Sequence, residues 1–470
     1  MKIVHSIIGS AAVFLTATSA LASSASVSGG VLTYTAGANE TNSVVVTLSG
    51  STYTINDTGA TITPPFGSGC SSVNANTVTC TGTIVQIVAQ LGNLHDAFWN
   101  TTSTPMNVAG GDNNDTIVGG AGADIINGDA GDDKLYGAGS GDLLMGGNDF
   151  DQIWGGPGVD YLNGGAGPDI LLGEGDDDTI HGGGASGYFQ DVASYASAPG
   201  AVTVDLAISG TGQNTINAGT DTLLDIQGVY GSNFADFLYG NDQQNLLGGG
   251  QGNDELYGRG GYDKLIGNEG DDDLFGGAGD DFLEGSIGND YLTGEAGLDY
   301  LVGDDYLFFV STSGNDTLVD GAGHNVFRGG PGNDDIWAVN DTADIIQCEG
   351  GTDTLFSDQS PVETSVANCE SNTQLPGSGA GAATNAYCAV KSIVQTVCAG
   401  CHHPGGAAPM SLLTFADTQP LRGSPPQLTW QMMKARVATL LTNPMPPGGL
   451  PQPEINAFNA WNGTGSDACY

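Results

Sequence analysis

The sequence predicts a mainly β protein that winds into a parallel β-roll, with an N-terminal β-cap and a small all-α domain at the C-terminal end. An aspartate recurs every nine residues, and an aliphatic residue follows two positions after each one, which predicts the roll. A Cys-x-x-Cys-His segment flanked by apolar residues at helical spacing predicts the all-α domain. The chain has 470 residues, 77 of them glycine, and this length allows several domains.

Residues 1–22 have the composition of a secretory signal peptide. Lys2 precedes an apolar run over residues 7–15, and Ala20-Leu21-Ala22 provides small residues for cleavage. The run is too short, and too interrupted by serine and threonine, for a membrane anchor. No other segment reaches membrane-spanning length. We therefore expect an exported chain, periplasmic, on the outer surface or extracellular, with no transmembrane segment in its mature form.

Residues 23–107 are rich in threonine, valine and serine. Residues 43–48 and residues 52–55 read as strands in which successive side chains face opposite sides of a sheet. The end of a solenoid exposes its core unless another segment covers it. We therefore expect residues 23–107 to form a β-rich cap on the first coil of the roll.

Residues 108–184 hold the first block of repeats, in which the nine-residue step is unbroken. Glycines open most of the segments between the aspartates, and glycine reaches positive φ without steric cost, so these segments can turn sharply. The last three residues of each repeat form a short strand whose middle side chain points inward. The aspartates are Asp115, Asp124, Asp133, Asp142, Asp151, Asp160, Asp169 and Asp178. The inward residues are Ile117, Ile126, Leu135, Leu144, Ile153, Leu162, Leu171 and Ile180.

Residues 185–230 are expected to form a wider coil, and residues 231–356 hold a second block of repeats with a frayed end. Asn245 and Asn325 replace two aspartates and lose their charge, so we expect weaker or absent sites there. The aspartates are Asp236, Asp254, Asp263, Asp272, Asp281, Asp290, Asp299, Asp316, Asp334 and, after a one-residue slip, Asp353. The inward residues are Leu238, Leu247, Leu256, Leu265, Leu274, Leu283, Leu292 and Leu301.

Stacked turns bring the carboxylates close enough to require a cation. Two strands on opposite walls make one coil, so turns on one side stack at about 4.8 Å. Carboxylates at that spacing repel, and calcium takes about six to eight ligands from carboxylate and carbonyl oxygens. Residues 1–384 carry five basic and 50 acidic residues, a net charge of −45, which destabilises a compact state without cations. Aspartates that merely favoured turns would not need a fixed place beside each glycine pair.

The pattern Gly-Gly-x-Gly-x-Asp-x-aliphatic-x resembles the RTX, or hemolysin-type, calcium-binding nonapeptide repeat and covers about residues 108–356. The resemblance implies a parallel β-roll in which the aspartate of one turn and carbonyls of the stacked turn share each calcium ion. It therefore implies that the aspartates of both blocks, from Asp115 to Asp353, are calcium ligands.

The eight cysteines of an exported chain are candidates for disulfides. Proximity in the sequence suggests three pairs: Cys70 with Cys80, Cys348 with Cys369, and Cys388 with Cys469. Residues 357–384 would then comprise the disulfide-closed end of the roll and a flexible linker. Cys398 and Cys401 remain unpaired in this scheme.

Cys398-Ala399-Gly400-Cys401-His402 has the spacing of a c-type haem attachment site. Both thiols would bond to the porphyrin vinyl groups, and the histidine would ligate iron. A redox disulfide or a zinc pair are the alternatives. A redox disulfide of this type belongs to a βαβ unit, and a zinc site needs a second pair of ligands; neither is evident here.

Residues 385–470 resemble a small class I cytochrome c, with a helical pattern before the motif and another near the end of the chain. The resemblance implies His402 as the proximal iron ligand and Met445, in Asn443-Pro444-Met445-Pro446-Pro447, as the distal one. Met410 is the second choice. A histidine–methionine pair raises the haem potential and suits electron transfer.

We find no Ser-His-Asp order, phosphate-binding loop or zinc-protease motif, so we expect an electron carrier rather than an enzyme. The alternative is a calcium-dependent structural or adhesive surface protein in which the haem is ancillary. A haem peroxidase is a weaker third hypothesis, because Met445 would block the open iron position. The expected cofactors are several calcium ions and one covalent haem c. The expected partners are an unidentified redox protein and the cell surface or extracellular matrix, and no nucleic acid.

Overall fold

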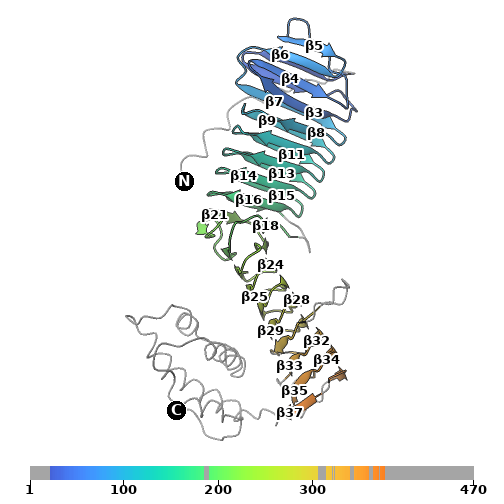
Figure 1. Cartoon of the computed structure of the whole chain (residues 1–470), viewed down its shortest axis with the longest axis vertical. Coiled ribbons are helices and arrows are strands. Elements are labelled where there is room, and N and C mark those ends of the chain that lie inside the picture. The colour runs from blue at the N-terminus through green and yellow to red at the C-terminus, as the bar shows by residue number, and fades with distance from the viewer. Residues whose placement is uncertain are drawn as a thin grey trace, which may run out of the picture. The chain divides into compact units, whose positions relative to one another are not determined.

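The computed structural model describes residues 22–184, 190–304, 314–319, 321, 323–338, 343–358, 364–369 and 371–375 (Figure 1). The regular elements among these residues are β-strands, and the prediction of a mainly β chain is confirmed for this part of the protein. No helix capable of crossing a membrane occurs among the same residues. The chain divides into two compact units, Met1–Asn233 and Phe234–Tyr470, which we call unit 1 and unit 2.

Unit 1 begins with strands that include three antiparallel hairpins. The strands are β1 (Ser24–Ser28), β2 (Val31–Thr35), β3 (Ser43–Ser49), β4 (Thr52–Asp57), β5 (Cys70–Asn74) and β6 (Thr77–Thr81). β1 pairs with β2, β3 with β4, and β6 with both β4 and β5. Alternate residues of β2 and β4 are buried, as expected for strands that cover a core on one face.

The remainder of unit 1 is a parallel roll with two walls. The first wall contains β7 (Gln86–Asn93), β9 (Met106–Asp112), β11 (Ile125–Ala130), β13 (Leu143–Asn148), β15 (Tyr161–Ala166), β17 (Thr179–Gly183) and β21 (Thr220–Leu224). The second wall contains β8 (Ala97–Asn100), β10 (Thr116–Gly120), β12 (Lys134–Ala138), β14 (Gln152–Pro157), β16 (Ile170–Gly175), β18 (Val192–Ser194) and β22 (Gly228–Tyr230). The hairpin strands continue both walls, because β2 pairs in parallel with β7 and β3 with β8. The joining segment also contains β19 (Thr203–Asp205) and β20 (Gly212–Asn214).

Unit 2 is a second parallel roll. Its first wall contains β23 (Phe237–Tyr239), β25 (Glu255–Gly260), β27 (Asp273–Ala278), β29 (Tyr291–Ala296), β31 (Thr317–Val319), β33 (Asp335–Ala338), β35 (Thr354–Asp358) and β37 (Ser371–Leu375). Its second wall contains β24 (Leu246–Gln251), β26 (Lys264–Glu269), β28 (Phe282–Ile287), β30 (Tyr300–Val302), β32 (Val326–Pro331), β34 (Ile345–Gly350) and β36 (Thr364–Ala367). β37 lies within residues 357–384, where a disulfide-closed end and a flexible linker were expected, and its backbone pairs in parallel with β35. Residues 371–375 are therefore a strand of the roll and not part of a linker.

The predicted inward residues form the core of both rolls. Each aliphatic residue two positions after a repeat aspartate is at most 1% exposed. In the register of the first wall Ile126 pairs with Leu144 and Leu144 with Leu162, so identical positions stack coil upon coil. Burial stabilises each such side chain by about 1.5–3 kcal/mol relative to exposure. The hydrophobic half of the nonapeptide pattern is therefore confirmed.

Two of the three predicted disulfides are present. Cys70 bonds to Cys80 between β5 and β6, with 4.1 Å between their Cα atoms. Cys348 of β34 bonds to Cys369, with 5.2 Å between their Cα atoms. The third predicted pair, Cys388 with Cys469, lies outside the described residues.

Candidate calcium sites

The structure brings the repeat aspartates together in two stacked rows in each unit, which we call the carboxylate columns. No aspartate of a column is more than 4% exposed. The columns of unit 1 are Asp96-Asp115-Asp133-Asp151-Asp169-Asp191 and Asp124-Asp142-Asp160-Asp178-Asp221. The columns of unit 2 are Asp236-Asp254-Asp272-Asp290-Asp316-Asp334-Asp353 and Asn245-Asp263-Asp281-Asp299-Asn325-Asp344.

One carboxylate oxygen, Oδ1, holds each column together. The backbone N–H of Asp115 donates to Oδ1 of Asp133, which lies on the next coil of the same column, at 2.7 Å. The same bond recurs along both units at 2.7–3.0 Å. Inside the repeat blocks the two residues are 18 apart, so one coil comprises two nonapeptides. This hydrogen bond fixes the carboxylate, and with it the direction of the second oxygen.

The second oxygen, Oδ2, is buried and accepts no hydrogen bond in most members of the columns. Buried polar atoms without a partner are rare in native proteins, and each costs about 1–3 kcal/mol or more when charged. Their regular recurrence indicates that a ligand other than a hydrogen-bond donor satisfies them. The atoms are Oδ2 of Asp96, Asp115, Asp124, Asp133, Asp142, Asp151, Asp160, Asp169, Asp178, Asp254, Asp263, Asp272, Asp281, Asp290, Asp299, Asp316 and Asp334.

Most of these oxygens lie against a glycine five positions earlier, and Oδ2 of Asp316 lies against Gly303, thirteen positions earlier. We call each such glycine, with the oxygens around it, a glycine cradle. A Cβ on Gly128 would lie within 3.0 Å of both Oδ2 of Asp133 and the carbonyl oxygen of Gly146 on the next coil. A carboxylate and a carbonyl oxygen therefore converge on a space that only glycine leaves open. The glycines whose cradle contains both kinds of oxygen include Gly110, Gly119, Gly128, Gly137, Gly146, Gly155, Gly249, Gly258, Gly267, Gly276, Gly303 and Gly329.

The atoms of a cradle fit calcium. Calcium prefers carboxylate and carbonyl oxygens, whereas zinc and copper favour histidine and cysteine. Among the described residues no group of three or more His, Cys, Asp or Glu side chains is arranged to hold one metal ion, so each cradle supplies one carboxylate and backbone carbonyl oxygens instead. A bound cation would neutralise Oδ2 and hold two successive coils together. The role of the repeat aspartates as calcium ligands stays a prediction from the resemblance.

Burial raises the pKa of the column carboxyls when no cation is bound. Desolvation is the largest cause, the backbone N–H from the neighbouring coil opposes it, and the stacked carboxylates add to it. The pKa of Asp115 and of Asp254 rises to about 8, and that of Asp316 to about 9. The pKa of Asp133 and of Asp281 rises to about 6.

These shifts predict that acid stabilises the calcium-free roll and weakens calcium binding. Such a carboxyl, whose pKa is 3.8 in the unfolded chain and higher in the folded one, binds its proton more tightly when the protein is folded. Its contribution to stability is fully present below pH 3.8 and is lost as the pH rises to about 8. Protons also compete with calcium for Oδ2. The calcium concentration at half-maximal circular dichroism should therefore be higher at pH 6 than at pH 8, and chelated protein should be more ordered at pH 6. A midpoint that is independent of pH would contradict the assignment of these carboxyls to the sites.

Two turns that lack the usual glycines keep the same backbone shape. The turns before Asp142 and Asp151 contain Ala138, Ser140 and Asp149, which adopt φ values of 81°, 73° and 74°. A non-glycine residue in this left-handed region costs about 1–2 kcal/mol. Oδ2 of Asp142 and Oδ2 of Asp151 nevertheless reach their cradles. The missing glycine therefore strains the backbone of the turn but does not move the carboxylate.

Four members of the columns lie outside the predicted set: Asp96, Asp191, Asp221 and Asp344. Asp221 accepts the backbone N–H of Asp178, 43 residues earlier, through Oδ1. Asp96, Asp191 and Asp344 accept the backbone N–H of Asn42, Asp169 and Asn325 through Oδ1. They are out of phase with the nine-residue step, because their partners lie 54, 22 and 19 residues away. Each of these three is followed two residues later by Phe98, Ala193 or Ile346, all fully buried. The Asp-x-apolar triplet, searched for without a fixed step, would have found them.

The predicted haem residues Cys398, Cys401, His402 and Met445 lie outside the described residues, as does the rest of residues 385–470. Their arrangement therefore contributes nothing to the geometry above. The calcium sites depend on the described parts of the two units alone.

The pattern of the RTX calcium-binding nonapeptide repeat (4 copies) matches residues 109–144, 136–171, 154–187, 230–265, 248–283, 266–301 and 310–342. These matches include most of the column aspartates of both units, so the chain contains RTX calcium-binding repeats wound into a β-roll. RTX repeats bind calcium, and proteins that contain them are typically secreted. No curated protein sequence matches the chain.

Proposed function

We propose that this chain is an exported protein whose β-roll orders on calcium outside the cytoplasm and whose C-terminal segment carries a covalent haem for electron transfer. The observation that carries the calcium part is the set of buried Oδ2 atoms that face glycine cradles in both units. The haem part rests on the Cys398-Ala399-Gly400-Cys401-His402 sequence. The location is supported by the apolar segment near the start of the chain.

Export and calcium dependence support each other physically. Calcium modules of extracellular proteins bind at about 10⁻⁴–10⁻³ M, far above cytosolic levels. A roll with that affinity stays poorly ordered in the cytosol and orders after export, when its carboxylates are neutralised. The disulfides Cys70–Cys80 and Cys348–Cys369 also suit an oxidising compartment.

In the haem segment, the thiols of Cys398 and Cys401 would attach the porphyrin, and His402 would ligate the iron on one side. Met445 would take the opposite side, with Met410 as the second choice. A six-coordinate haem of this kind exchanges electrons and does not bind a substrate at iron. The roll would then display or anchor the carrier at the cell surface or in the extracellular matrix, close to its redox partner.

The haem proposal predicts a complete loss of covalent haem from the C398S/C401S variant expressed in a host able to attach haem. Haem retained on a denaturing gel measures the attachment, and calcium-dependent circular dichroism should be unchanged because neither cysteine lies in a column. M445A should lose the methionine–iron absorption band, whereas the matched variant M410A should keep it. Wild-type protein without covalent haem from such a host would refute the proposal.

One observation supports a second candidate function, that of a structural or adhesive surface protein. The carboxylate columns extend through both units, so calcium-dependent rigidity involves most of the described chain. Such extensive calcium-dependent rigidity is expected of a structural or adhesive surface protein in which the haem is ancillary. It predicts calcium-dependent attachment to cells that persists in C398S/C401S, whereas an electron carrier predicts that redox exchange, and not attachment, depends on the haem.

A further inference from the structure

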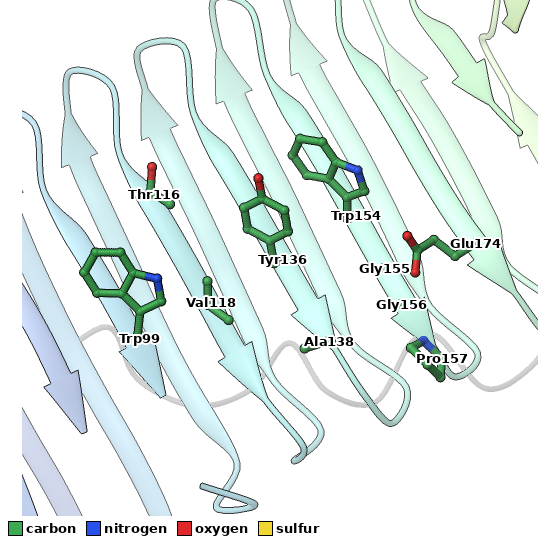
Figure 2. A pocket seen from close by; sticks show the side chains of 10 residues that line it. All are labelled: Trp99, Thr116, Val118, Tyr136, Ala138, Trp154, Gly155, Gly156, Pro157 and Glu174. Carbon is green, nitrogen blue, oxygen red and sulfur yellow. The ribbon is translucent and has the colours of Figure 1, made fainter. Parts of the chain in front are cut away.

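The outer face of the second wall of unit 1 carries a row of aromatic side chains. Along this wall Trp99 pairs with Val118, Val118 with Tyr136, and Tyr136 with Trp154. The rings of Tyr136 and Trp154 stack, with centroids 4.4 Å apart and an angle of 8° between their planes. Figure 2 shows the indoles of Trp99 and Trp154 in the same orientation, with Val118 between Trp99 and Tyr136. Since one face of Tyr136 stacks on Trp154, its other face is turned toward the strand that carries Val118.

Val118 leaves one position of this row without a ring. Adjacent strands are about 4.8 Å apart, so Trp99 and Tyr136, two strands apart, are separated by about 9.6 Å. A ring over Val118 would lie about 4.8 Å from each neighbour, which is a stacking distance. These residues line an open pocket that also contains Thr116 and ends at Glu174 (Figure 2). Val118 forms the floor, because its side chain is shorter than the rings beside it.

Unit 2 contains the same kind of row without the gap. Tyr239, Tyr257 and Phe275 occupy successive strands of its first wall. Their rings stack at 5.0 Å and 4.6 Å, with angles of 10° and 4° between the planes. Tyr257 thus occupies, between two rings, the position that Val118 leaves open in unit 1. The chain itself demonstrates that one aromatic ring fits this spacing.

We propose that the space over Val118 is a binding site for a planar aromatic ring, which inserts between Trp99 and Tyr136. The ligand is uncharged or cationic, because the chain has a formal charge of −44 and Glu174 lines the same pocket. Single-stranded nucleic acid also stacks bases on aromatic rings, but its phosphates require a basic groove, and this wall does not provide one. The ring can belong to a free small molecule or to an aromatic side chain of a peptide.

The test compares two substitutions at one position, in the full chain with calcium present. V118Y fills the space as Tyr257 does in unit 2, whereas V118A leaves it open. Equilibrium dialysis should show indole binding to the wild type and to V118A, and at least about tenfold weaker binding to V118Y. W99A, which removes one stacking face, should also bind indole more weakly. V118Y should unfold at a temperature no lower than the wild type, which separates a filled site from a damaged fold.

The choice of probe distinguishes the sources and the alternatives. Tighter binding of an uncharged Ala-Trp-Ala peptide than of indole assigns the site to a peptide side chain, and the reverse order assigns it to a free aromatic molecule. Indole-3-acetate should bind more weakly than indole because it is anionic. Equal indole binding by the wild type and V118Y overturns the proposal. Absence of indole binding overturns it as well. So does tighter binding of cellohexaose, an oligosaccharide without an aromatic ring, than of indole.

Discussion

Removal of calcium from the purified protein is expected to abolish most of its β-sheet circular dichroism. The columns place buried carboxyl groups at consecutive coils, and in most of them Oδ2 accepts no hydrogen bond. At calcium about 100-fold above the dissociation constant, each occupied site contributes about 2.7 kcal/mol to the free energy of unfolding. Four or five such sites equal the whole stability of a typical domain, about 5–15 kcal/mol. The columns contain many more cradles than that.

The measurement is a chelator titration followed by circular dichroism, with calcium added back at the end. Magnesium at the same concentration is the control, because it demands octahedral geometry and retains its waters, so it should restore little of the signal. Recovery with calcium alone supports cation-dependent folding. A roll that keeps its full β-sheet signal in chelator would show that the buried carboxyls are tolerated without a cation, and the calcium proposal would fail.

The second large effect is expected from the variant G128A. Its new Cβ would lie within 3.0 Å of Oδ2 of Asp133 and of the carbonyl oxygen of Gly146, and so would occupy the cradle. Gly128 is not among the positive-φ residues, so an alanine costs nothing in backbone conformation. We expect the loss of about one bound calcium and of about 3 kcal/mol of unfolding free energy, from the lost site and the crowding together.

G139A is the matched control, since Gly139 belongs to a turn of the same unit. The nearest atoms to its added Cβ are Cα of Ala121 at 3.8 Å and the carbonyl oxygen of Gly120 at 3.9 Å, which is ordinary contact. Its unfolding free energy should change by less than about 0.5 kcal/mol. Calcium stoichiometry and urea unfolding in calcium measure both variants. If G128A binds as much calcium as G139A, the cradles are not the calcium sites.

Much of the fold could be predicted because the repeat is both periodic and chemically restrictive. The step of nine residues determines which side chains point inward, and Ile126, Leu144 and Leu162 stack in the predicted register. The two short-range cysteine pairs followed from proximity alone. Covalent haem and its ligands remain predictions from sequence, because Cys398 and Met445 lie outside the described residues.

The membership of the columns could not be predicted from periodicity. Asp191 follows Asp178 after 13 positions rather than nine, yet it accepts the backbone N–H of Asp169 like any other member. Asp96 joins the same column before the first repeat. β18 pairs in parallel with β16, and this pairing restores the register after the longer loop. Strand pairing within the wall, and not the number of residues between aspartates, therefore determines which aspartates are neighbours.

Local pattern and composition were enough to predict the roll, its inward residues and its acidic character, and the match to the RTX repeat adds calcium as the metal that such repeats bind. The tertiary structure alone decided which carboxylates stack, because hydrogen bonds between coils join residues across interruptions in the repeat. It also gives the two carboxylate oxygens different roles: Oδ1 accepts the hydrogen bond that links successive coils, and Oδ2 faces a glycine cradle. The open position over Val118 likewise exists only between strands, because its two walls, Trp99 and Tyr136, belong to neighbouring coils.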